Sequence, residues 1–449
     1  MDWQFHMNDM SRIRPFLFAA GLTLMAPGAL TAEETGPEKN EYAPEPGGLE
    51  TFWNDVRFNG EISSLYTHTN PEEGIVNPNN SIKRIETGNW NTVARTEFSY
   101  KNRAAGINLR LEPWFSFERH FFDHAGGAPY SEENIQIGRY QAKFSGLIPR
   151  TTLAAQRGIV AWGPAFFGSP SNPFPDTSST ANPLEEEFGS DFLWMSHAFN
   201  GTWSMSAYQN YSRGSIDSVD SNPFKRAGTV AVHYNSYNYN VSLLAGNQED
   251  YGPIYGAYGQ WTLGEATVLY FDAGLRKRGR ARYPVESSNI LGGTYNSGKA
   301  VRKPEIVVGG SYTTADDTTF YGEYLFQGSG YSKGELDLAR DIALAANENL
   351  VGAPALSEGT LGLAALNELP YLGQHNASLI VSRSIGDFDL TFQNQTNMQD
   401  FTGRLYGSVV YSYGPAKFTL SLLQAYGREG GAFRQSVDTQ VVSGMLLRF

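Results

Sequence analysis

Apolar and polar residues alternate with period two through most of the chain after residue 52, and residues 437–449 show this pattern clearly. In a strand, successive side chains point to opposite faces. One face of this stretch would carry Val441, Ser443, Met445, Leu447 and Phe449. The other, more mixed face would carry Gln440, Val442, Gly444, Leu446 and Arg448. The pattern predicts a strand with one face suited to lipid.

The same alternation recurs near the start of this region, with stronger charges. Residues 94–101 set Ala94, Thr96, Phe98 and Tyr100 against Arg95, Glu97, Ser99 and Lys101. Residues 107–117 repeat the pattern, and residues 138–145 set an outer face of Gly138, Tyr140, Ala142 and Phe144 against Arg139, Gln141, Lys143 and Ser145. An Arg or Lys facing the middle of a bilayer costs about 2–4 kcal/mol, so we expect the charged faces to line a wet interior.

Short turn sequences divide the chain into hairpins. They occur at 101–103, 148–150, 200–201, 236–237, 263–265, 315–317, 385–387 and 413–416. Gly, Asn and Asp are common at these positions, as tight hairpins require. Eight such hairpins with an opening and a closing strand predict an all-β, transmembrane antiparallel β-barrel of about 18 strands. The competing fold, a soluble β-sandwich, leaves the aromatic lipid-type faces unexplained.

Longer polar stretches join the hairpins at the opposite end, and we expect them outside the cell. They lie at about 119–135, 163–190, 213–225, 278–302 and 328–371, beside an earlier one at 67–90. Within the last, residues 335–348 have helical rather than strand periodicity. This segment is predicted to form a short helix over or inside the mouth.

Composition agrees with a membrane barrel. The 449 residues include 48 Gly, 25 Tyr and 27 Phe but no Cys, which excludes disulfides, thiolate catalysis and Cys-ligated metals. The predicted mature part has no apolar run of about 20 residues that would span a bilayer as a helix. The formal net charge of −12 argues against a nucleic-acid partner.

The amino terminus has the order of a secretory signal peptide. Arg12 and Arg14 precede the apolar run 16–26, and small residues follow up to Ala32. We therefore expect a signal peptide at 1–32, with Met10 as an alternative start. Residues 33–51 are polar and proline-rich and predict a disordered periplasmic lead-in. The barrel would then occupy 52–449.

Charges on the predicted inner faces are candidate selectivity residues. These are Arg95, Glu97, Arg110, Glu112, Arg139, Lys143 and Arg157. Rings of charged side chains set ion and solute selectivity through their local field. The alternative is that they pair with one another and only satisfy a polar lumen.

A second candidate is the Gly- and Pro-rich stretch 156–174, with Trp162, Gly163, Pro164, Ser171 and Asn172. The Trp-Gly-Pro sequence with its following Gly-Ser and Ser-Asn pairs resembles the capsule-assembly Wzi family. That resemblance implies a barrel acting as a surface lectin for capsular polysaccharide. More loosely, the stretch is similar to the alginate-export porin family. The residues of this stretch, taken without any resemblance, predict a constriction loop. The alternative is a loop that merely folds back to narrow the pore, with Trp162 in an interfacial aromatic girdle.

Two further features suggest partners. The carboxy-terminal strand ending in Phe449 resembles that of Gram-negative outer-membrane β-barrel proteins, which implies outer-membrane lipid as surroundings and recognition by the barrel-assembly machinery. A basic run at the end of the predicted eleventh strand, Arg276, Lys277, Arg278, Arg280 and Arg282, is a candidate surface patch for lipopolysaccharide or an anionic polysaccharide. The alternative is that these residues only form the solvent-exposed base of a loop.

Together these patterns predict a porin-like channel in the outer membrane of a Gram-negative bacterium, for passive diffusion of small polar or anionic solutes, saccharides among them. The alternative is a non-conducting surface protein of the Wzi kind that attaches or exports polysaccharide. We expect no enzyme activity, because His197, His233 and His375 lack a visible Ser/Asp partner, and no nucleotide cofactor, because there is no phosphate-binding glycine loop. We expect no metal, because the acidic residues at 185–191 and 217–220 do not have the spacing of a defined calcium loop.

Overall fold

The computed structural model describes most of the chain from Val56 onward. The described residues are 56–71, 74–102, 104–122, 128–160, 162–166, 168–174, 189–214, 225–249, 251–277, 282–297, 302–365, 371–434 and 437–449. The predicted signal peptide and lead-in, 1–51, lie outside them.

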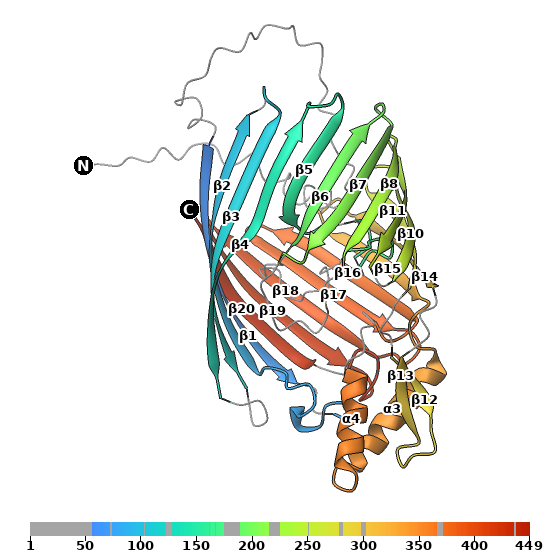
Figure 1. Cartoon of the computed structure of the whole chain (residues 1–449). Coiled ribbons are helices and arrows are strands. Elements are labelled where there is room, and N and C mark those ends of the chain that lie inside the picture. The colour runs from blue at the N-terminus through green and yellow to red at the C-terminus, as the bar shows by residue number, and fades with distance from the viewer. Residues whose placement is uncertain are drawn as a thin grey trace, which may run out of the picture.

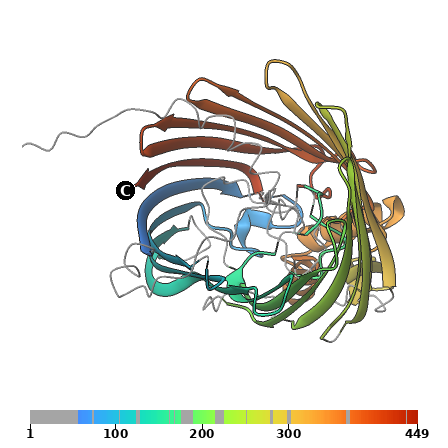
Figure 2. The same cartoon turned by 90° about the horizontal axis from the view of Figure 1, so that it is seen from above.

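Eighteen strands form a single antiparallel sheet that closes into a barrel (Figures 1 and 2). They are β1 (Val56–Pro71), β2 (Gly88–Asn102), β3 (Ile107–Phe121), β4 (Tyr130–Ser145), β5 (Thr151–Gly158), β6 (Ser190–Ala198), β7 (Trp203–Ser212), β8 (Ala227–Asn235), β9 (Tyr239–Gln248), β10 (Gly252–Leu263), β11 (Thr267–Lys277), β14 (Arg302–Thr313), β15 (Thr319–Gln327), β16 (His375–Ile385), β17 (Phe388–Asn397), β18 (Gly403–Tyr413), β19 (Ala416–Tyr426) and β20 (Val437–Arg448). The strand number and the antiparallel arrangement confirm the predicted fold class.

The first and last strands close the barrel. β1 pairs with both β2 and β20, with Ile62 opposite Leu447 and Glu61 opposite Arg448. Phe449 extends this ladder by exchanging backbone hydrogen bonds of 2.9 and 3.0 Å with Gly60. The edge of the Phe449 ring lies over Gly60, where a Cβ would make the ring turn aside. Closure leaves no free sheet edge.

The outer face of the barrel is apolar. Along each strand, exposed apolar side chains alternate with buried or polar ones, as the sequence pattern predicted. Examples on the outside are Phe98, Leu111, Leu243, Phe271, Val308, Leu379, Phe392, Leu420, Met445 and Leu447. Aromatic rings gather near the short turns; these include Trp203, Tyr234, Tyr239, Trp261, Phe388, Tyr411 and Tyr413. An apolar band bounded by aromatic side chains is the surface that a lipid bilayer requires.

The two ends of the barrel differ in the length of their connections. The eight predicted short turns all join neighbouring strands at one end, here called the turn end. The opposite end, the loop end, carries the longer connections. β1 begins at the turn end, and β20 ends there. The sequence overestimated two loops, because β1 continues to Pro71 and β2 begins at Gly88, and because β3 continues to Phe121 and β4 begins at Tyr130.

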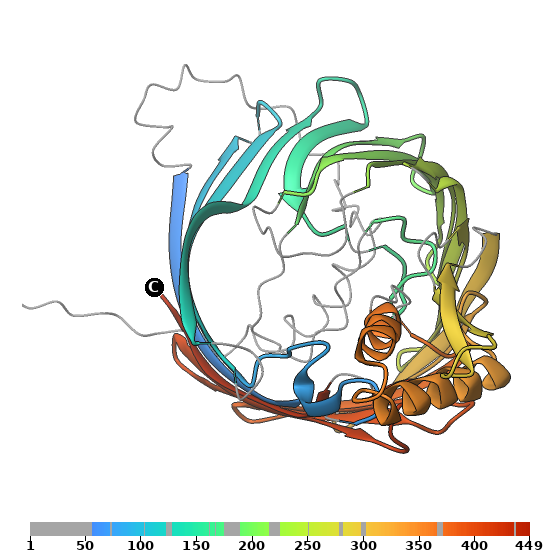
Figure 3. The same ribbon diagram turned by 60° about the horizontal axis from the view of Figure 1, so that its bottom comes forward.

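A small helical and hairpin unit, here called the cap, lies over one side of the loop end (Figures 1 and 3). It contains the hairpin β12 (Arg282–Glu286) and β13 (Gly293–Ser297) and the helices α3 (Lys333–Glu348) and α4 (Pro354–Ala365). Ser332 and Glu335 form a capping box that begins α3. Tyr295, Leu336 and Ile342 pack together in its interior. The predicted helix at 335–348 is confirmed, whereas α4 was not predicted. Within the described residues, neither helix is long and apolar enough to cross a membrane.

Candidate functional site

The segment after β5 folds into the barrel instead of standing out from its rim. Trp162 is only 2% exposed and packs on Phe174 and Tyr208, with ring centroids 5.9 and 4.9 Å apart. Val160 and Phe192 belong to the same cluster. The described part of this segment, 159–174 apart from residues 161 and 167, is called the infolded segment below. Because the segment lies inside the barrel, Trp162 does not belong to the lipid-facing aromatic girdle, and that part of the alternative is wrong, whereas the loop does fold back as the alternative expected.

Wall glycines make room for the infolded segment. A Cβ at Gly274 on β11 would collide with the carbonyl oxygen of Pro170, and one at Gly256 on β10 would lie 2.7 Å from the Cβ of Ser171. Within the segment, Gly163 and Gly168 have φ values of +78° and +102°, which side chains rarely adopt. The wall and the segment are therefore shaped for each other at backbone distance.

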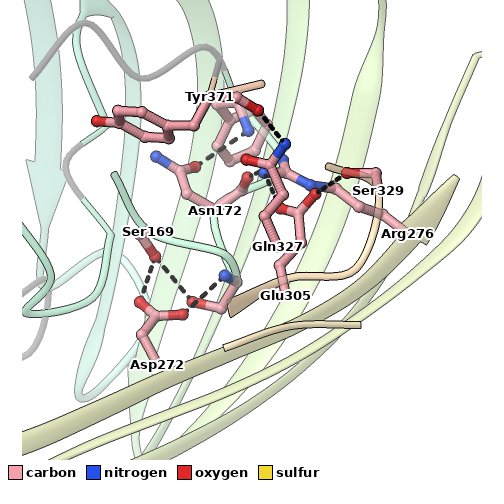
Figure 4. A network of polar contacts seen from close by, with 10 residues as sticks. Ser169, Asn172, Asp272, Arg276, Glu305, Gln327, Ser329 and Tyr371 are labelled. Atoms are coloured by element: carbon pink, nitrogen blue, oxygen red, sulfur yellow. Dashed lines mark hydrogen bonds and ion pairs between the residues drawn. The ribbon is translucent and has the colours of Figure 1, made fainter. Parts of the chain in front are cut away.

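Asp272 is the first polar anchor of the infolded segment. It lies on the inner face of β11 and is fully buried. Its carboxylate accepts the backbone N–H of Ser171 at 2.7 Å and the hydroxyl of Ser169 (Figure 4). The Ser169 and Ser171 hydroxyls are 3.0 Å apart, which completes a closed group of hydrogen bonds. A buried carboxylate needs such hydrogen-bond donors. Removing either the donors or the carboxylate would therefore lower the stability of the fold.

Glu323 is the second anchor. It lies on the inner face of β15, where its carboxylate accepts the backbone N–H of Phe166 at 2.6 Å and the hydroxyl of Tyr270 at 2.8 Å. The Phe166 ring packs edge-on against Tyr321, with centroids 4.8 Å apart. This anchor holds the middle of the segment at Phe166, and Asp272 holds the part nearer its end at Ser169 and Ser171.

Arg276 is the third anchor, and its place differs from the prediction. The sequence assigned it to a surface basic patch. On β11, however, Arg276 lies four residues after Asp272 and therefore on the same, inner face. Its guanidinium donates to the carbonyl of Asn172 at 2.8 Å and to Glu305 at 3.1 Å (Figure 4). Arg276 therefore holds the infolded segment. Of the other predicted patch residues, Lys277 ends β11 and Arg282 begins β12, while Arg278 and Arg280 lie outside the described residues.

A polar chain continues from Arg276 toward the connection before β16. Glu305 on β14 also accepts the hydroxyl of Ser329 at 3.2 Å. Beside it, Gln327 donates to the carbonyl of Tyr371 at 2.8 Å (Figure 4). The infolded segment and the loop that carries the helices of the cap are thus bonded to adjoining strands of one wall, β11 to β15.

The predicted constriction residues all lie in this segment. Trp162 belongs to its aromatic cluster, Ser171 bonds to Asp272, and Asn172 donates to the carbonyl of Val160 at 3.1 Å and accepts from Arg276. Gly163 and Pro164 form the stretch between Trp162 and Phe166. Asp272, Glu305 and Glu323 were missed by the sequence reasoning. A usable signal was present, because each is a carboxylate at an inward position between outward-facing residues.

The wall formed by β1 to β4 carries most of the predicted selectivity residues. Arg110 on β3 bonds Glu97 on β2 at 3.0 Å and also contacts Glu112. Glu61 contacts Arg95 and accepts Arg448 at 2.8 Å, across the barrel closure. Arg139 lies opposite Glu112, and Lys143 lies opposite Asn108, both on the inner face of β4. Six of the seven predicted residues therefore face the lumen.

Arg157 is the seventh, and the structure places it on the outer face. It lies opposite Tyr140, on the face away from Gln141 and Gln156, whose inward side chains are 2.9 Å apart. Arg157 donates to Asp191 at 2.7 Å and lies over the Tyr140 ring. It is not a pore-lining residue.

The alternation of inward- and outward-facing side chains is also interrupted along β4. The register between β3 and β4 shifts between Glu112 and Pro113, so both Gly138 and Arg139 turn inward. Gly138 was predicted on the outer face, but a Cβ there would collide with the Trp114 ring inside the barrel. This β-bulge keeps Arg139 at the level of Glu112.

In the part of the chain that the structure describes, no group of three or more His, Asp or Glu side chains is arranged to hold a metal ion. No protein-family model matches the chain, and no curated protein matches its sequence significantly.

Among solved structures, a triple variant of the Rh. blastica porin is 10% identical with a TM-score of 0.42, covering 88% of this chain and 100% of that chain. The outer membrane protein opdK from Pseudomonas aeruginosa is 10% identical with a TM-score of 0.48, over 88% of this chain and 99% of that chain. At this identity and TM-score the likenesses do not bear on function.

Proposed function

We propose that the protein is a porin-like channel of a Gram-negative outer membrane, through which small polar or anionic solutes, including saccharides, diffuse passively. The turn end would face the periplasm and the loop end the outside of the cell. The apolar outer face, the aromatic rings near the turns and the terminal strand closed by Phe449 support this placement. The carboxy-terminal residue would also be read by the barrel-assembly machinery.

The observation that carries the proposal is the division of the lumen into two walls. The infolded segment is fixed against β10 to β15 by buried carboxylates and by Arg276, so it occupies that side. Across from it, the charged side chains of β2 to β4 remain partly accessible, with 41% of the Arg110 side chain exposed. In this proposal the segment narrows the lumen without closing it, because a barrel of this strand number is wide enough for an aqueous channel.

The charge of the accessible wall supports anionic or polar solutes. Toward the turn end the inward cations are Arg57, Arg95, Lys101, Arg110, Arg139, Lys143, Lys417 and Arg448. On the turn-end part of these same strands, β1 to β4, β19 and β20, the inward carboxylates are Glu61, Glu97 and Glu112, and Asp389 faces inward on β17. Cations exceed carboxylates there, although the whole chain is acidic, so the field in this part of the lumen would favour anions.

Swelling of proteoliposomes tests the proposal. The refolded protein would be inserted into vesicles, and the vesicles diluted into isosmotic sugars of increasing size. We expect rapid swelling with small sugars and a cut-off as size grows. Vesicles that contain inserted protein but swell no faster than protein-free ones would contradict a diffusion channel.

The second candidate, a polysaccharide-binding surface protein of the Wzi kind, is favoured by one observation. The cap brings a hairpin and two helices together over one side of the loop end, more structure than a pore needs there. If the vesicles do not swell, binding of acidic polysaccharide to cells that display the protein would be the next measurement.

A further inference from the structure

Two cations lie directly opposite each other on the outer face of the barrel, at the loop end of neighbouring strands. Lys277 ends β11 and Arg302 begins β14, and the two form the last pair of that ladder. The pair before them, Arg276 and Lys303, faces the lumen. Because side chains alternate along a strand, Lys277 and Arg302 point away from the lumen. They are called the outer cation pair below.

The outer cation pair lies where the apolar outer face ends. The next outward pair toward the turn end is Leu275 with Pro304, and Ile306 follows on the same face of β14. Leu275 and Ile306 are exposed although both are apolar. In the other direction the chain leaves the barrel for the cap. The two cations are therefore at the edge of the band that contacts hydrocarbon, which is the level of lipid headgroups.

The outer cation pair has no ion pair with a carboxylate in the part of the chain that the structure describes. By contrast Arg157, another outward cation, is bonded to Asp191 at 2.7 Å. The stretches that join the outer cation pair to the cap, 278–281 and 298–301, contain Arg278, Arg280 and Lys299 but no Asp or Glu. Like charges directly opposite each other in a sheet are destabilising. An anion from outside the chain would remove that repulsion.

An aromatic ring positions one member of the outer cation pair. The Arg302 guanidinium lies over the Tyr255 ring, 5.9 Å from its centroid. Tyr255 is on the outer face of β10, opposite Leu275, and is itself exposed. A guanidinium that lies over a ring uses its flat face for that contact and keeps the N–H groups in its plane for other partners. Arg302 therefore offers hydrogen-bond donors at the lipid-facing surface.

We propose that the outer cation pair binds a phosphate group on the headgroup of an outer-leaflet lipid such as lipopolysaccharide. The guanidinium of Arg302 would donate two parallel hydrogen bonds to phosphate oxygens, and the ammonium of Lys277 would donate to a third oxygen. The acyl chains would lie along the apolar outer face, against Leu275 and Ile306. This inference rests on the proposed placement in an outer membrane and goes beyond the channel, because it concerns the outside of the barrel.

The probe for this site is diphosphoryl lipid A, the phosphate-bearing anchor of lipopolysaccharide, added to the refolded full chain in neutral-detergent micelles. Native mass spectrometry would count the lipid molecules bound to each folded chain as the lipid concentration rises. The comparison ligand is the same lipid after enzymatic removal of its phosphates. We expect saturable binding of lipid A and about tenfold weaker binding of the phosphate-free lipid. Equal binding of the two lipids would overturn the proposal.

Inorganic phosphate and a soluble acidic polysaccharide, polygalacturonate, separate a lipid headgroup from other anions. Each would be added in large molar excess to the complex with lipid A. We expect lipid A to stay bound, because its acyl chains make apolar contacts that the soluble anions lack. Displacement of lipid A by either soluble anion would contradict a lipid site.

Variants separate the site from general surface charge. Arg302→Gln should weaken the affinity for lipid A about fivefold, the effect of losing one exposed ion pair. Lys277→Gln makes the same test on the opposite strand. The matched control is Lys303→Gln, which removes a cation from the next residue of β14, on the lumen face. Unchanged affinity in both Arg302→Gln and Lys277→Gln, or equal weakening in Lys303→Gln, would contradict the site.

The binding assay does not depend on conduction. Binding of lipid A by a protein that does not make proteoliposomes swell would refute the channel and leave the lipid site intact. Swelling without a preference for the phosphate-bearing lipid would refute the lipid site and leave the channel intact.

Discussion

The carboxylate of Asp272 on β11 accepts the backbone N–H of Ser171 at 2.7 Å, across 101 residues of chain. This bond, with the Ser169 hydroxyl on the same carboxylate, fixes the end of the infolded segment to the barrel wall. In the proposed channel the size of the lumen would depend on how firmly that segment is held, so the anchors make the most direct predictions.

Asp272→Ala should release the end of the infolded segment. The substitution removes the acceptor of two buried donors, which costs about 1–3 kcal/mol for each unpaired group. We expect larger and noisier single-channel currents, because the segment would leave the wall for part of the time. Asp317→Asn is the control, since it removes a carboxylate in an exposed turn where φ is +60°, a value Asn tolerates. Unchanged current in Asp272→Ala would show that the segment does not limit the pore.

Gly274→Ala tests the same docking from the wall side. The added Cβ meets the carbonyl oxygen of Pro170, so the segment must shift, at a cost of about 1–3 kcal/mol for overpacking. We expect the current to change in the same direction as in Asp272→Ala. Gly322→Ala on β15 is the matched control, because nothing lies within 4 Å of its added Cβ. If Gly274→Ala and Gly322→Ala give the same current, close packing between the segment and the wall does not set the conductance.

The inward arginines should set ion preference. Arg110→Gln with Arg139→Gln removes two cations from the lumen and leaves Glu97 and Glu112 without the Arg110 guanidinium. We expect the anion-to-cation permeability ratio, measured as a reversal potential in a salt gradient, to fall roughly threefold.

The matched control for that pair removes two cations from the outer face. Arg157→Gln with Arg383→Gln has the same effect on net charge, but the two side chains pair with Asp191 and Asp316 outside the lumen. Its reversal potential should equal that of the wild type. A shift as large as that of the inner pair would show that net charge, and not the lumen wall, decides the preference.

Lys83, in the loop before β2, should make stability depend on pH. Burial, with the nearby Arg404 as the second cause, lowers the pKa of Lys83 from 10.5 to about 8. Between these values the unfolded chain binds more protons than the folded one, so stability rises with pH across this window. Below about pH 8 the full cost of the buried charge is present, with an upper bound of about 3 kcal/mol.

Urea unfolding in micelles at pH 7 and pH 10.5 would measure this. Lys83→Met should be more stable than the wild type at pH 7, and the advantage should shrink at pH 10.5. Lys101→Met, at an exposed position near a short turn, should show no such dependence. A constant advantage of Lys83→Met at both pH values would contradict the lowered pKa.

The sequence was sufficient for the barrel because its signals are local. Alternation within each strand identifies the lipid-facing side, and the eight turns fix the strand number by parity. The same alternation placed Arg95, Glu97, Arg110 and Glu112 inside correctly. The predicted helix was also local, because the spacing of apolar residues in 335–348 needs no tertiary information.

Three other features depend on tertiary structure. Arg157 was assigned to the lumen because β5 has no clear alternation, and its outer position is tolerated through the ion pair with Asp191 and the Tyr140 ring. Gly138 was misplaced because a β-bulge shifts inward parity within β4. Arg276 was assigned to the surface as one of a basic run, yet its partners, Asn172 and Glu305, come from distant parts of the chain.

Single-channel conductance of the refolded chain in a planar bilayer tests the central claim most directly. The two-walled lumen predicts steady open steps, and Asp272→Ala should enlarge them. A silent membrane, with insertion confirmed by a folded form that migrates faster than the boiled one on a denaturing gel, would contradict the channel.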